Sequence, residues 1–178
     1  MMAFDAYRCY LSLMKVNQKY PVYRMVYPYA KKSNPILHEI ILNNAHTLDK
    51  GALMTSWKSY DIKEFNLICT WIRNFLLSSS LTTRHDDLIL SDYDLWGQLY
   101  NKGSYQEAHD HLPAHWSFVY YVNTPRGSSP LVFEESKKRY YPKTGEAIVF
   151  PGWIRHFVPP NKCEGRSIVD GNFMYTGK

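Results

Sequence analysis

Three histidines, His109, His111 and His156, have the residue type and spacing to bind a metal ion. His109 and His111 are two residues apart, so on an extended backbone their side chains project to the same side. His156 follows a tight turn at Pro151-Gly152 and starts a later predicted strand, which a jelly roll can bring beside the first. Imidazole suits iron, zinc, copper and nickel. Three such ligands in a facial arrangement leave three octahedral positions open for reactants.

The other four histidines have positions with ordinary explanations. His38 and His46 fall on a predicted helix, His85 falls in a polar turn, and His115 comes just before a predicted strand. We therefore expect the metal-binding set to be His109, His111 and His156.

The segment beyond about residue 85 must supply the framework for these histidines, and its pattern is that of short strands. Apolar runs alternate with turn residues that include Asn101-Lys102-Gly103 and Pro142-Lys143-Thr144-Gly145. The predicted strands are 88–90, 95–100, 116–122, 131–133, 138–141, 147–150, 155–158 and 167–175. Strands at such even spacing indicate a jelly-roll-like barrel or sandwich.

Before residue 85 the sequence predicts one edge strand and two helices. Residues 20–29 alternate and contain two prolines, which is typical of an edge strand. Apolar residues at helical spacing predict a helix over 34–48 and a second, more strongly patterned helix over 61–78. Asp61 and Glu64 resemble a capping box at the start of the second helix. Both helices should pack on one outer face of the sheet.

Length and composition favour a single globular domain over residues 1–178, with helical and edge-strand support in 1–84 and a jelly-roll core in 85–178. The three cysteines, Cys9, Cys69 and Cys163, form no disulfide framework, so we expect a reducing cytoplasm. Residues 1–10 contain no apolar segment typical of a signal peptide. No run approaches the roughly 20 apolar residues that a membrane span needs.

The net charge of +5 is spread along the chain, which favours ordinary scattered surface charge over attraction to nucleic acid. We also expect no membrane partner.

From about Trp57 to Phe173 the sequence resembles the 2-oxoglutarate- and iron(II)-dependent oxygenases of the prolyl-hydroxylase-like type, and is most similar to a bacterial and viral branch. Three segments carry the resemblance: 99–109 with its Asn101-Lys102-Gly103 turn, the apolar strand 117–122, and the run 145–151 followed by His156 and Arg166. The final segment has a glycine, a Phe-Pro pair, a distal histidine and, ten positions later (166 − 156 = 10), a basic residue.

The resemblance implies a double-stranded β-helix, mainly β with flanking helices, and the cofactors iron(II), 2-oxoglutarate and dioxygen. It implies that the three histidines hold the iron and that Arg166 and Tyr100 bind 2-oxoglutarate. An arginine suits this role because its planar, permanently charged fork can hold the distal carboxylate bidentately. The Tyr100 hydroxyl can add a hydrogen bond.

The sequence departs from the usual pattern of this superfamily at two positions. The usual metal motif is His-x-Asp, whereas position 111 is a histidine, so either His111 or the neighbouring Asp110 completes the site. The related branch also carries His-x-His, which favours His111. Ile168 stands where many members have a serine, which removes one hydroxyl contact to the co-substrate.

The function implied is hydroxylation of a substrate coupled to 2-oxoglutarate decarboxylation. A peptide side chain or a small molecule is favoured as substrate over a nucleic acid; neither the substrate nor the oligomeric state is assigned by the sequence. Two alternatives are a cupin-like three-histidine metalloenzyme that works without 2-oxoglutarate, and a non-catalytic jelly-roll binding or structural protein. Trp116, Trp153 and Arg155 lie near the expected pocket mouth, where we expect packing or rim positions rather than substrate contacts.

Overall fold

The computed structural model describes residues 20–49, 51–79 and 88–177. Within them the chain forms two helices, α1 (Ala30–Asn44) and α2 (Lys63–Ser78), and a set of strands. The strands are β1 (Tyr23–Val26), β2 (Thr47–Asp49), β3 (Ala52–Met54), β4 (Leu88–Tyr100), β5 (Gln106–His109), β6 (Trp116–Asn123), β7 (Leu131–Phe133), β8 (Arg139–Tyr140), β9 (Glu146–Pro151), β10 (His156–Val158) and β11 (Arg166–Gly177).

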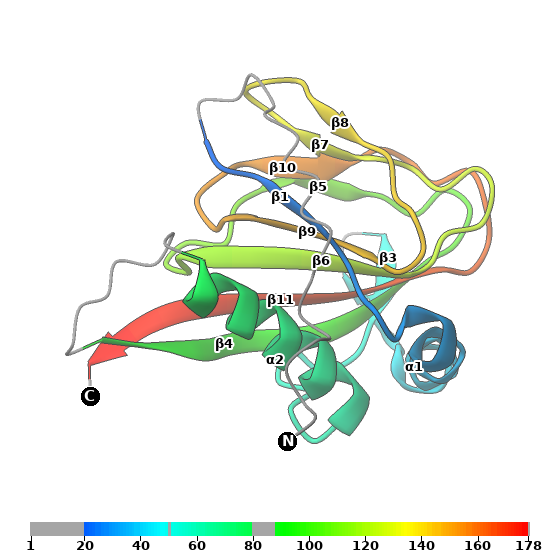
Figure 1. Ribbon diagram of the computed structural model, residues 1–178. Helices are drawn as coiled ribbons and strands as arrows, with labels where there is room; N and C mark the ends of the chain where they lie inside the picture. The colour runs from blue at the N-terminus through cyan, green and yellow to red at the C-terminus, as the bar shows by residue number, and fades with distance from the viewer. Residues whose placement is uncertain (1–19, 50, 80–87, 178) are drawn as a thin grey trace.

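The strands form two sheets that face each other, as the jelly-roll prediction required (Figure 1). The larger sheet has the order β1-β9-β6-β11-β4-β3-β2, and the smaller has the order β5-β10-β7-β8. Every strand pair within them is antiparallel. The long strand β11 lies between β4 and β6 in the large sheet, with Arg166 opposite Tyr100 at its start.

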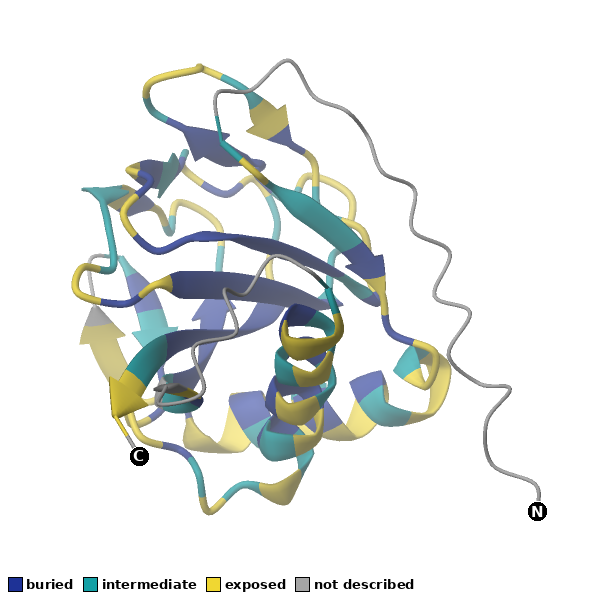
Figure 2. Cartoon of the chain, turned by 60° about the vertical axis from the view of Figure 1, so that its left-hand side comes forward, coloured by how far each residue is buried: buried dark blue, intermediate teal, exposed yellow. Residues whose placement is uncertain are grey.

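Two apolar cores follow from the alternation of side chains along these strands. One core lies between the outer face of the large sheet and the two helices, where Phe65, Ile72, Leu95, Phe118 and Val169 pack together. The other lies between the sheets and includes residues of both. In Figure 2 the central strands are buried over most of their length and partly exposed at the ends of β4 and β11, while each helix exposes its outer face. The helices therefore cover one outer face of the jelly roll, as predicted.

Helix α1 begins and ends about four residues before the predicted range 34–48. Helical spacing of apolar residues predicts a start at Asn34, whereas the helix begins at Ala30 and Pro35 lies inside it. The Asn34 side chain is instead occupied with the large sheet, donating to the Val122 carbonyl at 2.8 Å. Leu48 was assigned to the helix by its spacing, but it lies on strand β2 and is 71% exposed.

Two smaller sequence predictions were also wrong. Asp61 does not cap helix α2, because Ile62 takes the capping position and no side chain bonds to the free N–H groups. The two strands predicted over 88–90 and 95–100 are one strand, β4, with a bulge opposite Asn172 and Phe173. The polar residues between them read as a turn, but their carboxylates have partners within the fold. Asp92 pairs with Arg73 at 2.9 Å and Asp94 accepts from Asn172 at 3.2 Å.

The large sheet draws strands from both sides of residue 85. The edge strand β1, confirmed within the predicted range 20–29, pairs with β9, and β3 pairs with β4. Residues 1–19 and 80–87, which include Cys9 and His85, lie outside the described residues, so the predictions made for them stay predictions. Among the described residues, neither helix has the length and apolar character needed to cross a bilayer.

Candidate functional site

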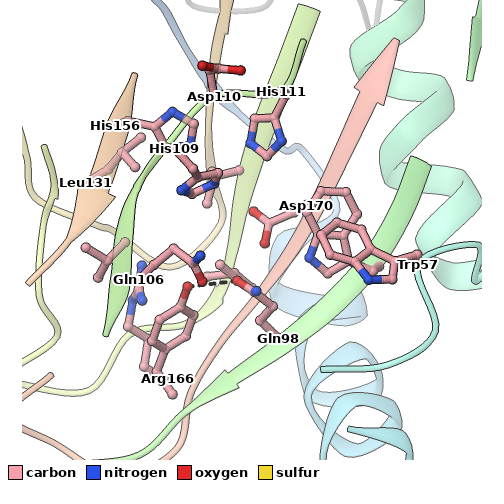
Figure 3. Close-up of a pocket in the computed structure, with 15 residues that line it drawn as sticks. Trp57, Gln98, Gln106, His109, Asp110, His111, Leu131, His156, Arg166 and Asp170 are labelled. Carbon is pink, nitrogen blue, oxygen red and sulfur yellow. Dashed lines mark hydrogen bonds between the residues drawn. The ribbon is translucent and has the colours of Figure 1, made fainter. Parts of the chain in front are cut away.

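The three predicted histidines converge on one point between the sheets (Figure 3). His109 ends β5 and His156 begins β10, and the two residues face each other directly in the antiparallel register. His111 follows β5 by two residues. The potential ligand atoms of the three imidazoles all lie within 4.8 Å of one another, and the ring centroids are 4.5–5.0 Å apart. The arrangement could hold one metal ion.

Backbone carbonyl groups fix the tautomer of two of these rings. His109 Nδ1 lies 2.7 Å from the Glu107 carbonyl oxygen, and His156 Nδ1 lies 2.8 Å from the Ile154 carbonyl oxygen. A carbonyl only accepts, so Nδ1 carries the proton in both rings and Nε2 has a lone pair for a metal. Burial, and then the neighbouring His109 and His111, lower the pKa of His156 well below its usual range. The neutral imidazole is the form that binds a metal.

His111 is positioned by the turn between β9 and β10. Its backbone N–H donates to the Gly152 carbonyl at 2.7 Å, and the Gly152 N–H donates to the His115 carbonyl at 3.1 Å. A Cβ on Gly152 would lie 2.3 Å from the Ala114 carbonyl oxygen, so only glycine permits this close approach. The Pro151-Gly152 turn therefore fastens the loop of His111 to the strand of His156.

The carboxylate of Asp110 points away from the three imidazoles (Figure 3). Its Oδ1 accepts from the Leu112 N–H at 3.2 Å, and its Oδ2 lies 3.9 Å from Arg155 Nη1. In the described residues the histidines are thus brought together without Asp110.

Arg166 lies on the inner face of β11 and lines the same cavity as the histidines. It is fully buried, and its guanidinium carbon stands 4.3 Å from the centroid of the Tyr100 ring. Its Nε, Nη1 and Nη2 atoms have no aligned hydrogen-bond acceptor among the described residues. A buried guanidinium without an acceptor costs free energy, and an anion that entered the cavity could supply the acceptor.

Tyr100 pairs with Arg166 across β4 and β11, and its ring lies beneath the guanidinium. Its hydroxyl donates to Gln98 Oε1 at 2.8 Å. Burial raises the pKa of Tyr100 far above its usual range, and the Arg166 cation opposes this rise. The hydroxyl therefore stays protonated and remains a donor or acceptor at any physiological pH.

These side chains share one cavity of about 200 Å³. Its lining combines the histidines and Arg166 with apolar and polar side chains from both sheets: Trp57, Trp96, Gln98, Tyr100, Gln106, Asp110, Val119, Leu131, Val158, Ile168 and Asp170. In Figure 3 Arg166 and Gln98 lie at one end of the cavity and the histidines at the other. The cavity can thus receive an elongated anion with one end at Arg166 and the other at a metal.

Asp170 is the most significant lining residue that sequence reasoning missed. It is 6% exposed, and its Oδ1 has no hydrogen-bond partner among the described residues. Burial raises its pKa to about 8, although Arg166 opposes the rise. Strand alternation could have found it, because a residue four positions after Arg166 on one strand faces the same side. Gln98 could have been found in the same way, because it lies two positions before Tyr100 on β4 and faces the same side.

The other residues considered for the pocket mouth lie elsewhere. Trp116 packs in the core beneath the helices, and Trp153 stacks edge-on against Tyr20. Arg155 binds Glu134 at 2.7 Å. The tryptophans that do line the cavity are Trp57 and Trp96.

The remaining described histidines lie outside the cavity. The imidazole of His38 lies 2.8 Å from the Ser167 hydroxyl on the outer side of the large sheet, and His115 accepts from the Tyr175 N–H. His46 is exposed.

Two facing antiparallel sheets, with a histidine cluster and a buried arginine between them, form a double-stranded β-helix. No protein-family model and no curated protein matches the sequence. Among solved structures, the fold matches a viral collagen prolyl hydroxylase from Paramecium bursaria Chlorella virus-1, solved as a 2OG complex. The TM-score is 0.70 at 16% identity, over 88% of this chain and 96% of the other.

Two further solved structures show the same fold. A prolyl-4-hydroxylase from Pseudomonas putida matches with a TM-score of 0.62 at 16% identity, over 87% of this chain and 92% of the other. The protein named IDO from Bacillus thuringiensis matches with a TM-score of 0.58 at 13% identity, over 87% of this chain and 93% of the other. The predicted fold is therefore confirmed. Sequence identities this low support a shared fold and nothing further.

Proposed function

We propose that this chain is a non-haem iron(II) oxygenase that couples oxidative decarboxylation of 2-oxoglutarate to hydroxylation of a substrate C–H bond. In this reaction 2-oxoglutarate, dioxygen and the substrate give succinate, carbon dioxide and the hydroxylated product. The prolyl-hydroxylase fold and the cavity that joins three histidines to one arginine support it.

Arg166 is the observation that carries the proposal. A cation without an acceptor, fully buried beside a histidine cluster, is unfavourable unless an anion completes it. A dicarboxylate would match both ends of the cavity. One carboxylate would pair with the Arg166 guanidinium, and the other carboxylate would reach the metal position. A three-histidine metal site without a dicarboxylate gives no reason for Arg166 to be buried there.

The proposed roles of the side chains follow from their positions. Nε2 of His109 and of His156 would bind iron, with His111 as the third ligand. Iron supplies the open coordination positions at which the keto acid and dioxygen react. Arg166 would bind the distal carboxylate, and the Tyr100 hydroxyl would add a hydrogen bond.

The walls of the cavity would keep the co-substrate dry. Val119, Leu131 and Ile168 present apolar surface to the space between Arg166 and the histidines. The low local polarity strengthens the pairing of Arg166 with a carboxylate. Ile168 in place of a serine leaves this pairing to Arg166 and Tyr100.

The substrate is proposed to be a peptide side chain or a small molecule. The prolyl hydroxylases that share the fold make either class reasonable for this chain. We also propose that the chain forms a single domain and that the protein is located in the cytoplasm.

Anaerobic reconstitution with iron(II) tests the metal centre. The wild-type protein should bind iron in equimolar amount, and His109→Ala, His111→Ala or His156→Ala should each lose most of it. His46→Ala, an exposed histidine outside the cavity, is the matched control and should bind iron like the wild type. Asp110→Asn should also retain iron. A protein that binds no iron under these conditions would favour the non-catalytic jelly-roll alternative.

A further inference from the structure

None of the roles proposed above uses Asp170, although a carboxyl group buried at this position needs a polar partner. It lies four residues after Arg166 on the inner face of β11, yet no Arg166–Asp170 ion pair within 4.0 Å exists among the described side chains. Its Oδ1 is buried without a hydrogen-bond donor. 2-Oxoglutarate would bring two more carboxylates into the cavity and would not satisfy it. A hydrogen-bond donor, and best a cation, would complete the carboxylate in its ionised form.

Aromatic surface of the kind that binds cations lies beside this carboxylate. Trp57 and Trp96 line the same cavity, with ring centroids 4.5 Å apart. Figure 3 shows Trp57 and the Asp170 carboxylate on the same side of the cavity, apart from Arg166. Trp57 is 47% exposed, so this end of the cavity is open to an incoming molecule. An indole face is the best aromatic partner for an ammonium group.

We propose that Asp170, Trp57 and Trp96 form the substrate subsite and that it takes an alkylammonium group. The proposal rests on the oxygenase function and adds the substrate class to it. The Asp170 carboxylate would pair with the ammonium while the indoles cover its alkyl carbons. The Trp96 ring lies 6.0 Å from the His111 ring, so a chain anchored there extends toward the metal position. The raised pKa of Asp170 fits this role, because an entering cation stabilises the ionised carboxylate that burial disfavours.

Calorimetric titration of the anaerobic iron(II)–2-oxoglutarate protein tests the subsite. The probes are n-butylammonium, n-butanol and butyrate, which share a chain and differ in charge. We expect n-butylammonium to bind at least about tenfold more tightly than n-butanol, and butyrate to bind least. Asp170→Asn and Trp57→Leu should each remove most of this preference. Asp61→Asn makes the same charge change at an exposed position and should keep it.

The possible failures are distinguishable because iron and 2-oxoglutarate binding are measured first on each protein. Loss of either in the wild type contradicts the oxygenase function itself. Normal iron and 2-oxoglutarate binding with equal affinity for butylammonium and butanol overturns only the subsite. An unchanged preference in Asp170→Asn overturns it as well, and so does loss of iron from that variant, which would make Asp170 a metal ligand.

Comparison of Nα-acetyl-lysinamide with a lysine-containing peptide then identifies the source of the ammonium group. Tighter binding of the peptide points to a protein substrate, and equal binding points to a small amine. Either result supports the proposal, whereas binding of neither, together with no preference for n-butylammonium over n-butanol, overturns it.

Discussion

Two ionisable side chains, Arg166 and Asp170, are buried in one cavity without a direct ion pair between them. Their spacing along β11 places both on the inner face but separates them by Ile168. Buried charges are usually paired, so two that are not paired indicate positions reserved for ligands. In the proposals above, the same cavity holds an anion at one end and a cation at the other.

Arg166→Met keeps the length of the side chain and removes its charge. We predict that 2-oxoglutarate affinity falls by about 10- to 100-fold, because a charge-assisted hydrogen bond is worth about 1.5–3 kcal/mol. Iron content should not change, because Arg166 is not a ligand. Arg126→Ala removes an exposed arginine and should leave 2-oxoglutarate affinity as it is. Unchanged affinity in Arg166→Met would shift the account to a three-histidine enzyme without 2-oxoglutarate.

Asp170 should make the metal-free protein less stable as the pH rises. Its pKa is about 8 in the folded chain and about 4 in the unfolded chain. Between these values the unfolded state loses a proton that the folded state retains, so the free energy of unfolding falls as pH rises from about 4 to 8. Asp170→Asn has no titrating carboxyl group at this position. The melting temperature of the variant minus that of the wild type should therefore increase with pH across this window.

Thermal unfolding of both metal-free proteins at several pH values measures this difference. Each kcal/mol corresponds to roughly 2–4 °C for a chain of this size. Comparing the two proteins cancels the other titrating groups. A constant difference from pH 4 to 8 would show that Asp170 is ionised in the folded state, contrary to its surroundings.

Residue types and spacing in the sequence named the histidines, and the resemblance to the 2-oxoglutarate oxygenases named Arg166 and Tyr100. The structure brings all of them to one cavity. Asp170 was missed because a single carboxylate in an apolar strand carries no motif. Trp57 was missed because it reaches the cavity from the loop after β3, a contact between distant segments that local patterns do not record.

At the scale of elements, the site depends on the contacts between the loop after β5 and the turn between β9 and β10. β5 and β10 bring His109 and His156 into register, while His111 lies beyond the end of β5. The close contact between Gly152 and Ala114 holds the loop of His111 in place. The β9–β10 turn is therefore as important to the metal site as the strands.

Gly152→Ala should lower metal affinity without removing any ligand. The new methyl group would lie 2.3 Å from the Ala114 carbonyl oxygen, so the loop of His111 must shift. We expect about a tenfold loss of iron affinity, the size typical of changes just outside the ligands. Gly177→Ala, where a Cβ meets nothing within 4 Å, is the control. Equal iron affinity in both variants would mean that His111 does not depend on this turn.

Strand alternation and turn residues predicted most strands of the jelly roll within one or two residues. The errors arose where tertiary contacts override local signals. Asn34 looked like a helix start, but its side chain binds β6. The acidic stretch before Leu95 looked like a turn, but Arg73 and Asn172 satisfy it and the strand continues.

At the scale of the whole molecule, the two sheets are joined around a cavity that contains unsatisfied polar groups. Arg166 and Asp170 come from the large sheet, and His109 and His156 come from the small one. A metal and a dicarboxylate bound between them would therefore link the two sheets. Ligands that bind only the folded state stabilise it by mass action.

Iron(II) and 2-oxoglutarate together should raise the melting temperature under anaerobic conditions. At a concentration of about 100 times the dissociation constant, one ligand adds about 2.7 kcal/mol, which corresponds to roughly 5–10 °C here. Arg166→Met should respond to iron and not to 2-oxoglutarate, whereas His156→Ala should respond to neither. If neither iron(II) nor 2-oxoglutarate changed the wild-type melting temperature, this would contradict a cavity that binds both ligands.

Succinate formation tests the central claim most directly. The anaerobic iron(II) protein is mixed with 2-oxoglutarate and with ascorbate, which supplies the two electrons that a substrate C–H bond would otherwise give. The mixture is then exposed to dioxygen, and the acids are measured by proton NMR. The account predicts conversion of 2-oxoglutarate to succinate that requires iron and dioxygen and is lost in His156→Ala. It also predicts that Arg166→Met needs a much higher 2-oxoglutarate concentration for the same yield. Full iron occupancy with 2-oxoglutarate left unchanged after exposure to dioxygen would contradict the account.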